Sequence, residues 1–390
     1  MKVVDVSAFY TPHGGGVRTY VENKINYALK SGIDLVVIIP GAANSIEQRN
    51  SNARVISIAS PKLVFDGRYR YFNNTNAIHT ILDREQPDIV EASSPWRTAN
   101  IVADWRGKAI KSLFMHADPI GVYADRWFGN FASQNRIDQG FDAYWRHLRR
   151  ACSHFDAVIC ANPELAQRLK TNGISNTSII PLGVDAGRFS PQLRSEDLRQ
   201  KLLRHCSLPP EARLLIGIGR FSPEKRWPMV VEAVAAAGAE HPIGLILIGE
   251  GRGRPAILRA MAGNPHIRII QRVRDRHLMA QIIASADALV HGCESETFGL
   301  GVAEAAASGS PLIIPEQGGC AGFLDASCTE SYRPGDAHSL YRAIKRMFER
   351  DETVVRQSAA SRANRILSVD DHFDQLFQTY MSPAHTICAA

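Results

Sequence analysis

The stretch that decides the fold is ALVHGCESETFGLGVAEAAASGSPLIIP, residues 288–315. It begins and ends with short apolar runs, which are typical of buried strands. Between them, a loop with glycines leads into the alanine-rich run LGVAEAAA, which predicts a helix beginning near Gly299. A strand, a helix and a second strand in this order form a βαβ unit, and such units build parallel sheets that are covered by helices on both faces.

The same alternation runs through most of the chain. A polar stretch with several prolines at 182–212 interrupts it, and the rhythm then restarts. We therefore predict two doubly wound α/β domains, residues 1–188 and 189–368, followed by a helical tail at 369–390. Further apolar runs that predict strands are KVVDVSAFY (2–10), IDLVVIIP (33–40), PDIVEAS (87–93), KSLFMHA (111–117), FDAVICAN (155–162), LLIGIGR (214–220), IGLILIGEG (243–251) and IRIIQRV (267–273).

The composition is that of an ordinary globular protein. The chain has 390 residues, of which 45% are hydrophobic and 22% charged, and no apolar run approaches the length of a spanning helix. The amino terminus, MKVVDVSAFY, reads as a first strand and not as a signal peptide. The seven cysteines are scattered without CxxC spacing, which argues against a disulfide framework or a zinc knuckle. We expect a cytoplasmic protein.

The net charge of +6 is unevenly distributed along the chain. Residues 1–190 hold 22 Lys and Arg against 17 Asp and Glu, whereas residues 191–390 hold 23 against 22. A basic first half suits nucleic acid, an anionic membrane surface or a phosphate-bearing substrate. The sequence shows no nucleic-acid-binding module, so we expect no nucleic-acid partner.

Two glutamates flank the start of the helix predicted near Gly299. Glu296 falls in the loop before it, and Glu304 falls more than one turn inside it. The free backbone N–H groups at a helix start can bind phosphate, while the carboxylates can accept hydrogen bonds from sugar and ribose hydroxyls. The alternative is a helix start where acidic residues merely complement the dipole, above a packed alanine face.

Two cations follow the apolar run LLIGIG. Arg220 and Lys225 lie in GRFSPEK, where the strand ends and ligands of doubly wound sheets gather. Such a pair can stabilise the charge that develops on a diphosphate leaving group. On its own the pair would more often be part of a solvated loop.

A glycine run follows the first strand. Gly14, Gly15 and Gly16 in PHGGGVRTY precede a predicted helix, so their backbone can approach a phosphate or a sugar closely. A tight strand-to-helix turn would explain the glycines equally well. GEGRGR at 249–254 does not fit the dinucleotide fingerprint, and we interpret it as a structural turn.

Taken together, these motifs resemble the GT-B glycosyltransferases of family GT4, the retaining group 1 enzymes that include bacterial phosphatidylinositol mannosyltransferases and many polysaccharide and glycolipid enzymes. The resemblance covers nearly the whole chain. The segments that carry it are GGGV (14–17), HAD (116–118), PLGVD (181–185), GRFSPEK (219–225), LIGEG (247–251) and ETFGLGVAEAAASG (296–309).

The resemblance implies a GT-B fold, with two Rossmann-like domains that face each other across a cleft and a C-terminal helix that returns to the first. It implies a nucleoside diphosphate sugar as co-substrate, no cofactor and no metal. The residue roles that it implies are these: Gly15 and Gly16 near the donor phosphate and sugar, His116 beside the transferred sugar, Arg220 and Lys225 on the diphosphate, Glu296 on the sugar hydroxyls, the amides of Phe298, Gly299 and Leu300 on phosphate, and Glu304 on the ribose.

The sequence departs from the family pattern in places that bear on packing and on the acceptor. Thr297 stands where many relatives have proline, and SGSP at 308–311 replaces a commoner CGxP. The segments 62–74 and 120–150 mix arginine with aromatic residues and match nothing that fixes an acceptor. An inward-facing amphipathic helix with Trp127, Phe131, Phe141 and Trp145 explains the second segment better than a binding surface does.

The expected activity is therefore transfer of a hexose-type sugar from a UDP- or GDP-sugar, with retention of configuration, to a hydroxyl of a lipid or lipid-linked saccharide. The enzyme would lie in the cytoplasm, with peripheral association with the inner membrane face through its basic first half. Two alternatives stay open. One is a GT-B sugar-nucleotide epimerase, and the other is a non-catalytic nucleotide-sugar binding protein.

Overall fold

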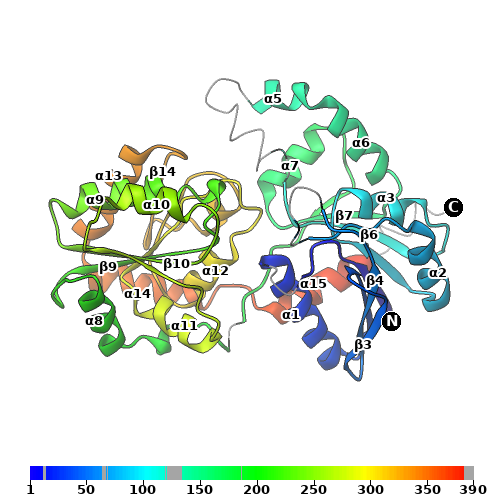
Figure 1. The fold of residues 1–390 in the computed structure, drawn as a ribbon, viewed down its shortest axis with the longest axis horizontal. Coiled ribbons are helices and arrows are strands. Elements are labelled where there is room, and N and C mark those ends of the chain that lie inside the picture. Colours follow the sequence, from blue (N-terminus) through cyan, green and yellow to red (C-terminus); the bar gives the residue numbers. More distant parts are fainter. Residues whose placement is uncertain are drawn as a thin grey trace. The chain divides into compact units, whose positions relative to one another are not determined.

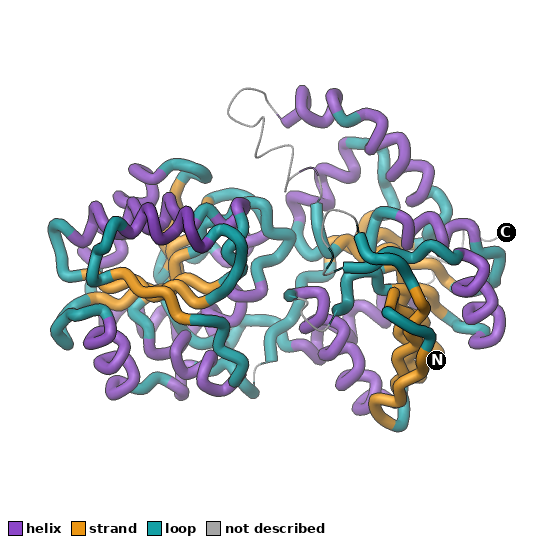
Figure 2. The backbone as a smooth tube through the Cα atoms, viewed as in Figure 1, coloured by secondary structure: helices purple, strands orange, loops and turns teal. Residues whose placement is uncertain are grey.

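The structure is a computed structural model that describes residues 1–11, 15–63, 67, 69–118, 120, 134–185 and 187–381, without the side chains of residues 134 and 135. The chain divides into two compact units. Unit 1 is Met1–Pro181 with Asp370–Ala390, and unit 2 is Leu182–Val369. Figure 1 labels the elements of both units, and Figure 2 shows a bundle of adjacent strands at the centre of each.

Unit 1 is built on a sheet in the order β3-β4-β2-β1-β5-β6-β7-β8. Neighbouring strands are parallel except β3 and β4, which pair antiparallel. The strands are β1 (Lys2–Val6), β2 (Asp34–Gly41), β3 (Ser45–Asn50), β4 (Ala53–Ala59), β5 (Ile89–Ala92), β6 (Ile110–Met115), β7 (Ala157–Cys160) and β8 (Thr177–Ile179). The helices are α1 (Gly16–Ser31), α2 (Thr75–Glu85), α3 (Arg97–Asp104), α5 (Gln134–Gly140), α6 (Asp142–Cys152), α7 (Pro163–Thr171) and α15 (Val369–Met381).

Unit 2 is built on a wholly parallel sheet in the order β11-β10-β9-β12-β13-β14. Figure 1 shows α9, α10 and α13 over one face and α8, α11 and α14 over the other. The strands are β9 (Arg213–Ile218), β10 (Ile243–Ile248), β11 (Ile267–Ile270), β12 (Ala288–Val290), β13 (Leu312–Pro315) and β14 (Thr329–Tyr332). The helices are α8 (Glu196–His205), α9 (Trp227–Gly238), α10 (Arg254–Met261), α11 (Arg276–Ser285), α12 (Leu300–Ala307), α13 (Ala337–Glu349) and α14 (Glu352–Ala363), with short 3₁₀ turns at Pro191–Leu193, Pro223–Lys225 and Gly319–Phe323.

The predicted fold class is confirmed, with one correction. We expected parallel sheets, but β3 pairs antiparallel with β4 at the edge of unit 1. The residues of β3, SIEQRN, are exposed or half-buried. A strand that faces solvent lacks the apolar run by which we recognised the buried parallel strands, and for this reason the sequence did not predict it.

The C-terminal helix α15 packs on unit 1, as the resemblance implied. Phe373, Phe377 and Tyr380 are buried. Tyr27 of α1 stacks on Phe377 with ring centroids 5.8 Å apart, and its hydroxyl hydrogen bonds to Asp374. Since α1 and α15 lie at opposite ends of the sequence, this packing ties the end of the chain to its beginning.

Helix α15 packs against a cluster of buried charged side chains. Lys24 Nζ donates to Asp5 Oδ2 at 2.9 Å and to Glu91 Oε1 at 2.6 Å, and Tyr380 Oη donates to Glu91 Oε2 at 2.7 Å. Burial lowers the pKa of Lys24, but the charges of Asp5 and Glu91 more than offset this, so its pKa is raised and the amine stays charged. The cluster therefore joins β1, β5, α1 and α15 through charge-assisted hydrogen bonds.

We predict that Lys24→Met destabilises unit 1 severely. Its removal leaves two buried carboxylates without their cation, a change that costs about 3–5 kcal/mol. The melting temperature should fall by roughly 10 °C in a calorimetric scan.

Lys30→Met is the matched control for this prediction. Lys30 is on the same helix and its Nζ pairs with Asp370 Oδ2 at 2.9 Å, but both side chains are more than half exposed. Exposed ion pairs contribute little, so this variant should melt within about 2 °C of the wild type. Equal shifts in the two variants would refute the account of the cluster.

Candidate functional site

The candidate site of unit 2 lies where its parallel strands end. Three loops leave carboxyl ends of neighbouring strands: residues 219–226 after β9, 291–299 after β12 and 316–319 after β13. Because β12 lies between β9 and β13 in the sheet, the three loops emerge beside one another. Ligands of doubly wound sheets bind at this edge.

Lys225 and Glu296 form the centre of the site. The ammonium of Lys225 hydrogen bonds to Glu296 Oε1, although the two residues are 71 positions apart in the sequence. His291 Nε2 lies 3.6 Å from the same carboxylate oxygen. The Glu296 side chain is about one quarter exposed, so it can be reached from solvent. The structure therefore brings together two of the predicted residues and adds a histidine that we did not predict.

Arg220 is held by its backbone, and its side chain is largely exposed to solvent. Its carbonyl accepts a hydrogen bond of 3.0 Å from Trp227 Nε1, and the Trp227 side chain is buried. The guanidinium is 59% exposed and pairs with Glu224 at 3.5 Å. A fixed main chain with a solvated cation on the site loop fits the predicted binding of a diphosphate.

The loop after β10 contains Gly249, Gly251 and Gly253, which allow it to pack against the backbone on either side of Arg220. A Cβ on Gly249 would come within 1.9 Å of the Gly219 carbonyl oxygen, and Gly253 N donates to the Phe221 carbonyl at 2.7 Å. The GEGRGR stretch thus contacts protein backbone. This contact agrees with our interpretation of the stretch as a structural turn.

Glu304 lies on α12 and is paired with a cation from α11. Arg276 Nη2 donates to Glu304 Oε1 at 2.7 Å, and the Arg276 guanidinium lies 5.1 Å from the ring centre of Phe189. Burial raises the pKa of Glu304, and Arg276 opposes that rise. Arg276 was not predicted from the sequence, because its role depends on the packing of α11 beside α12.

The start of α12 is shaped by Gly299. This residue has a left-handed φ of 82°, and a Cβ on it would lie 2.5 Å from Cys320 Sγ. Leu300 is half-buried, and the buried ring of Phe298 packs edge-on against Phe323 at 5.3 Å. The Phe298 side chain is therefore part of the core, and only the backbone amides of this turn could meet a phosphate.

Two glycines of the loop after β13, Gly318 and Gly319, pack against the loop that carries Glu296. Neither glycine was predicted from the sequence. Gly318 has a φ of 80°, and a Cβ on it would meet the Glu294 carbonyl oxygen at 1.7 Å. Gly319 N donates to the Glu296 carbonyl at 2.7 Å. This hydrogen bond fixes the backbone of Glu296 from the β13 side.

The remaining predicted residues belong to unit 1. Gly15 caps α1, Gly16 is its first residue, and both are exposed; Gly14 lies outside the described residues. His116 follows β6, and its ring contacts Phe114 and Tyr20 at centroid distances of 4.5 and 4.7 Å. Burial lowers the pKa of His116 to about 3, so the imidazole is neutral at pH 7.

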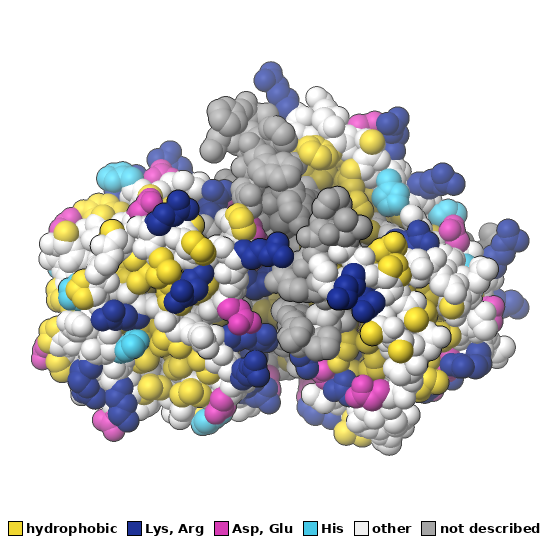
Figure 3. Space-filling view, viewed as in Figure 1, with side chains coloured by type: hydrophobic (Ala, Val, Ile, Leu, Met, Phe, Trp, Pro, Cys, Tyr) yellow, Lys and Arg dark blue, Asp and Glu magenta, His cyan; other side chains and the backbone are white. Residues whose placement is uncertain are grey.

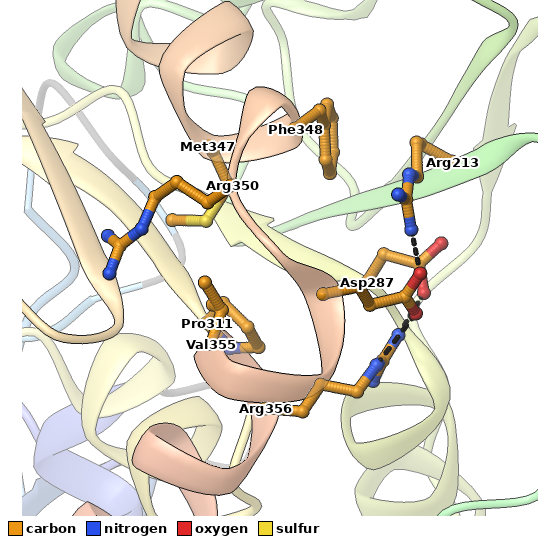
Figure 4. Close-up of a pocket in the computed structure, with 9 residues that line it drawn as sticks. Arg213, Asp287, Pro311, Met347, Phe348, Arg350, Val355 and Arg356 are labelled. Atoms are coloured by element: carbon orange, nitrogen blue, oxygen red, sulfur yellow. Dashed lines mark hydrogen bonds and ion pairs between the residues drawn. The ribbon is translucent and has the colours of Figure 1, made fainter.

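A small pocket in unit 2 lies at the amino ends of the strands, opposite the candidate site (Figure 4). It is lined by Arg213 at the start of β9, by Asp287 just before β12 and by Pro311 just before β13, together with Met347, Phe348, Arg350, Glu352, Val355 and Arg356. Asp287 accepts hydrogen bonds from Arg199 at 2.9 Å and from Leu214 N at 2.7 Å, and it also pairs with Arg356. These partners join the amino ends of the strands, and we assign this cluster a structural role.

The aromatic segments of unit 1 are described only in part. Trp145 is buried and Phe141 packs against the core, as expected for an inward-facing helix, whereas Trp127 and Phe131 lie outside the described residues. On the face that Figure 3 shows, lysine and arginine are dispersed among other side chains. Within the part of the chain that the structure describes, no helix is both long enough and apolar enough to span a bilayer.

Comparison with known proteins extends the geometric findings. Residues 14–188 match the model described as Glycosyltransferase Family 4, and residues 212–350 match that of Glycosyl transferases group 1. A GDP-mannose-dependent alpha-(1-6)-phosphatidylinositol dimannoside mannosyltransferase of Mycobacterium tuberculosis is 28% identical, over 93% of this chain and 92% of the relative. A GDP-mannose-dependent alpha-mannosyltransferase of the same species is 26% identical, over 82% and 80%.

Solved structures agree on the fold. Sucrose-phosphate synthase from Thermosynechococcus elongatus superposes with a TM-score of 0.79 at 17% identity, covering the whole of both chains. The two family models follow one another in the expected order and together cover most of both units. The chain thus belongs to the group 1 glycosyltransferases of family GT4 and has their GT-B fold.

Proposed function

We propose that this glycosyltransferase moves a hexose from a nucleoside diphosphate sugar to a hydroxyl of a glycolipid acceptor, with retention of anomeric configuration. The observation that carries the proposal is the pairing of Lys225 with Glu296 beside the start of α12. One cation, one sugar-binding carboxylate and the free amides of a helix start occupy the edge of the sheet where a donor would bind.

The relatives favour GDP-mannose as the donor. Both mannosyltransferases described above carry GDP-mannose in their names, and the first spans almost the same length as this chain. Both names also describe alpha-mannosyl transfer, and we propose an α-product for this chain as well. The sequence alone left UDP- and GDP-sugars equally open, and a UDP-sugar is the second candidate donor for this chain.

The chemistry follows from the charges. Departure of the diphosphate builds negative charge that Arg220 and Lys225 can stabilise, and interactions stronger in the transition state raise the rate. We propose that Glu296 holds sugar hydroxyls and that Glu304 holds the ribose. The departing diphosphate would assist deprotonation of the attacking hydroxyl on the same face of the sugar.

The test is an acceptor-dependent release assay with the full chain. GDP-mannose and UDP-glucose are offered separately with and without a phosphatidylinositol mannoside, and proton NMR follows the anomeric signal of the first product. Acceptor-dependent release of GDP with an α-product supports the proposal. Conversion of the donor without acceptor favours an epimerase, and the absence of any turnover despite binding favours a binding protein.

We predict that Lys225→Ala lowers turnover by about a hundredfold, the scale of losing one preorganised electrostatic contact. Lys345→Ala is the matched control, because Lys345 Nζ also pairs with a glutamate, Glu240, at 2.6 Å, but on helix α13, outside the three loops of the site. The control should keep its turnover within about twofold. Equal losses would refute the role of Lys225.

A binding experiment should distinguish the role of Glu296 from that of Glu304. Glu296→Gln should damage transfer while preserving affinity for GDP, because the carboxylate is assigned to the sugar. Glu304→Ala should weaken the binding of GDP itself, because this carboxylate is assigned to the ribose. Titration calorimetry with GDP measures the affinity of both variants. Equal losses of GDP affinity would mean that the roles are misassigned.

We also propose that the reaction needs no divalent metal, because Lys225 and Arg220 already provide positive charge for the diphosphate. Initial rates should therefore be unchanged in excess EDTA. Loss of activity on chelation, restored by magnesium or manganese, would contradict this prediction.

Membrane association through unit 1 is a separate expectation that follows from its charge. Basic residues near an anionic surface contribute about 1 kcal/mol each, and salt screens them beyond about 8 Å. Sedimentation with vesicles should show binding that rises with anionic lipid and falls with salt. If no binding occurs at low salt, the acceptor is not presented at a membrane through this charge.

A further inference from the structure

The loop after β12 brings together three potential metal ligands, of which the proposed donor chemistry uses only Glu296. His291, Cys293 and Glu296 each place one potential metal-ligand atom so that all three atoms lie within 4.8 Å of one another. They come from six consecutive residues, 291–296, that have no regular secondary structure. Among the described residues, this is the one group of three such side chains whose ligand atoms come this close together.

His291 points an unused nitrogen into this group. The residue is 4% exposed, and its Nε2 neither donates nor accepts a hydrogen bond within the described part of the chain. The ring also hydrogen bonds to the backbone of Cys293, and this bond involves the other nitrogen because Nε2 has no partner. A hydrogen bond from the other ring nitrogen to the backbone orients the imidazole of many histidines that bind metals.

The three ligand types select the metal. Imidazole, thiolate and carboxylate together suit Zn²⁺, whereas Mg²⁺ and Ca²⁺ prefer oxygen ligands alone. Bond lengths of 2.0–2.3 Å place tetrahedral zinc ligands about 3.3–3.6 Å apart. The 3.6 Å between His291 Nε2 and Glu296 Oε1 already meets this spacing, and Cys293 Sγ lies within 4.8 Å of both atoms.

We propose that His291, Cys293 and Glu296 form a zinc site within the donor loop, with its fourth position open. Zinc would displace the Lys225 ammonium from Glu296, and the Cys293 thiol would lose its proton to solvent. The ion, the thiolate and the carboxylate together carry no net charge, and Lys225 is set free. No electron transfer is involved.

Zinc in this position inhibits the enzyme, since it occupies the carboxylate assigned to the donor sugar. This consequence rests on the proposed function, whereas the binding of zinc does not. The partly exposed Glu296 side chain provides the entry to the site, while Cys293 and His291 are buried behind it.

The site is tested with the metal alone. The full chain, stripped with EDTA and dialysed, is titrated with CoCl₂ while its absorption is followed, and then with ZnCl₂ by calorimetry. We expect a sulfur-to-cobalt charge-transfer band and one zinc per chain. Cys293→Ala should lose the band and bind zinc at least about 100-fold more weakly, the upper range for disturbing even an outer-shell partner.

Two further variants make the result decisive. Cys206→Ala removes another buried thiol of unit 2 and should keep the band and the zinc affinity. Glu296→Gln changes a partly exposed ligand and should weaken zinc by about tenfold, even if Cys293→Ala fails to fold. Absence of the band in the wild type, or zinc affinity in Cys293→Ala within threefold of the wild type, would overturn the site.

The inhibition is measured separately, on donor turnover. Zinc should inhibit the wild-type enzyme at concentrations that fill the site, and EDTA should restore the full rate. If zinc binds to these ligands but turnover continues, the zinc site stands and the assignment of Glu296 to the donor sugar fails. The two proposals can therefore fail independently.

Discussion

The parallel pairing of β12 with β9 on one side and β13 on the other is the constraint on which the candidate site depends. Parallel strands end at the same edge, so residues 71 positions apart, Lys225 and Glu296, come into hydrogen-bonding contact. At the opposite edge, buried Asp287 accepts a hydrogen bond from Leu214 N at 2.7 Å and ties the amino ends of β9 and β12 together. The amino ends of the strands thus hold structural ion pairs, and their carboxyl ends hold the candidate site.

The proposed donor ligands are already engaged with each other or with neighbours. Lys225 holds Glu296, and Arg276 holds Glu304 at 2.7 Å. These ion pairs keep partly buried charges compensated, since an isolated buried charge would be costly. A donor would then exchange one set of polar partners for another. Such an exchange preserves the orientation of the carboxylates and limits the entropy lost on binding.

The sequence predicted the features that have a local signature. Apolar runs marked many of the buried strands, and Gly299 with the following alanines marked α12, which begins at Leu300. The buried strand β4 was missed, because Arg54 and Ser57 interrupt its apolar residues. The edge strand β3 was missed because its exposed residues carry no apolar pattern. Arg276, His291 and Gly318 were missed for a different reason: each acquires its role from a contact with a residue distant in the sequence or from a turn that only the folded loop creates.

Lys225 also explains how one loop could serve both the proposed metal-independent reaction and the proposed zinc site. With the ammonium on Glu296, the loop presents a cation beside the start of α12, where it could compensate the charge of a diphosphate. The same carboxylate oxygen lies 3.6 Å from the unused nitrogen of His291, so a divalent ion with an affinity for imidazole and thiolate can compete for it. The cation and the metal are alternative partners of one oxygen. Occupation of Glu296 by one excludes the other, and the balance between them depends on the availability of zinc.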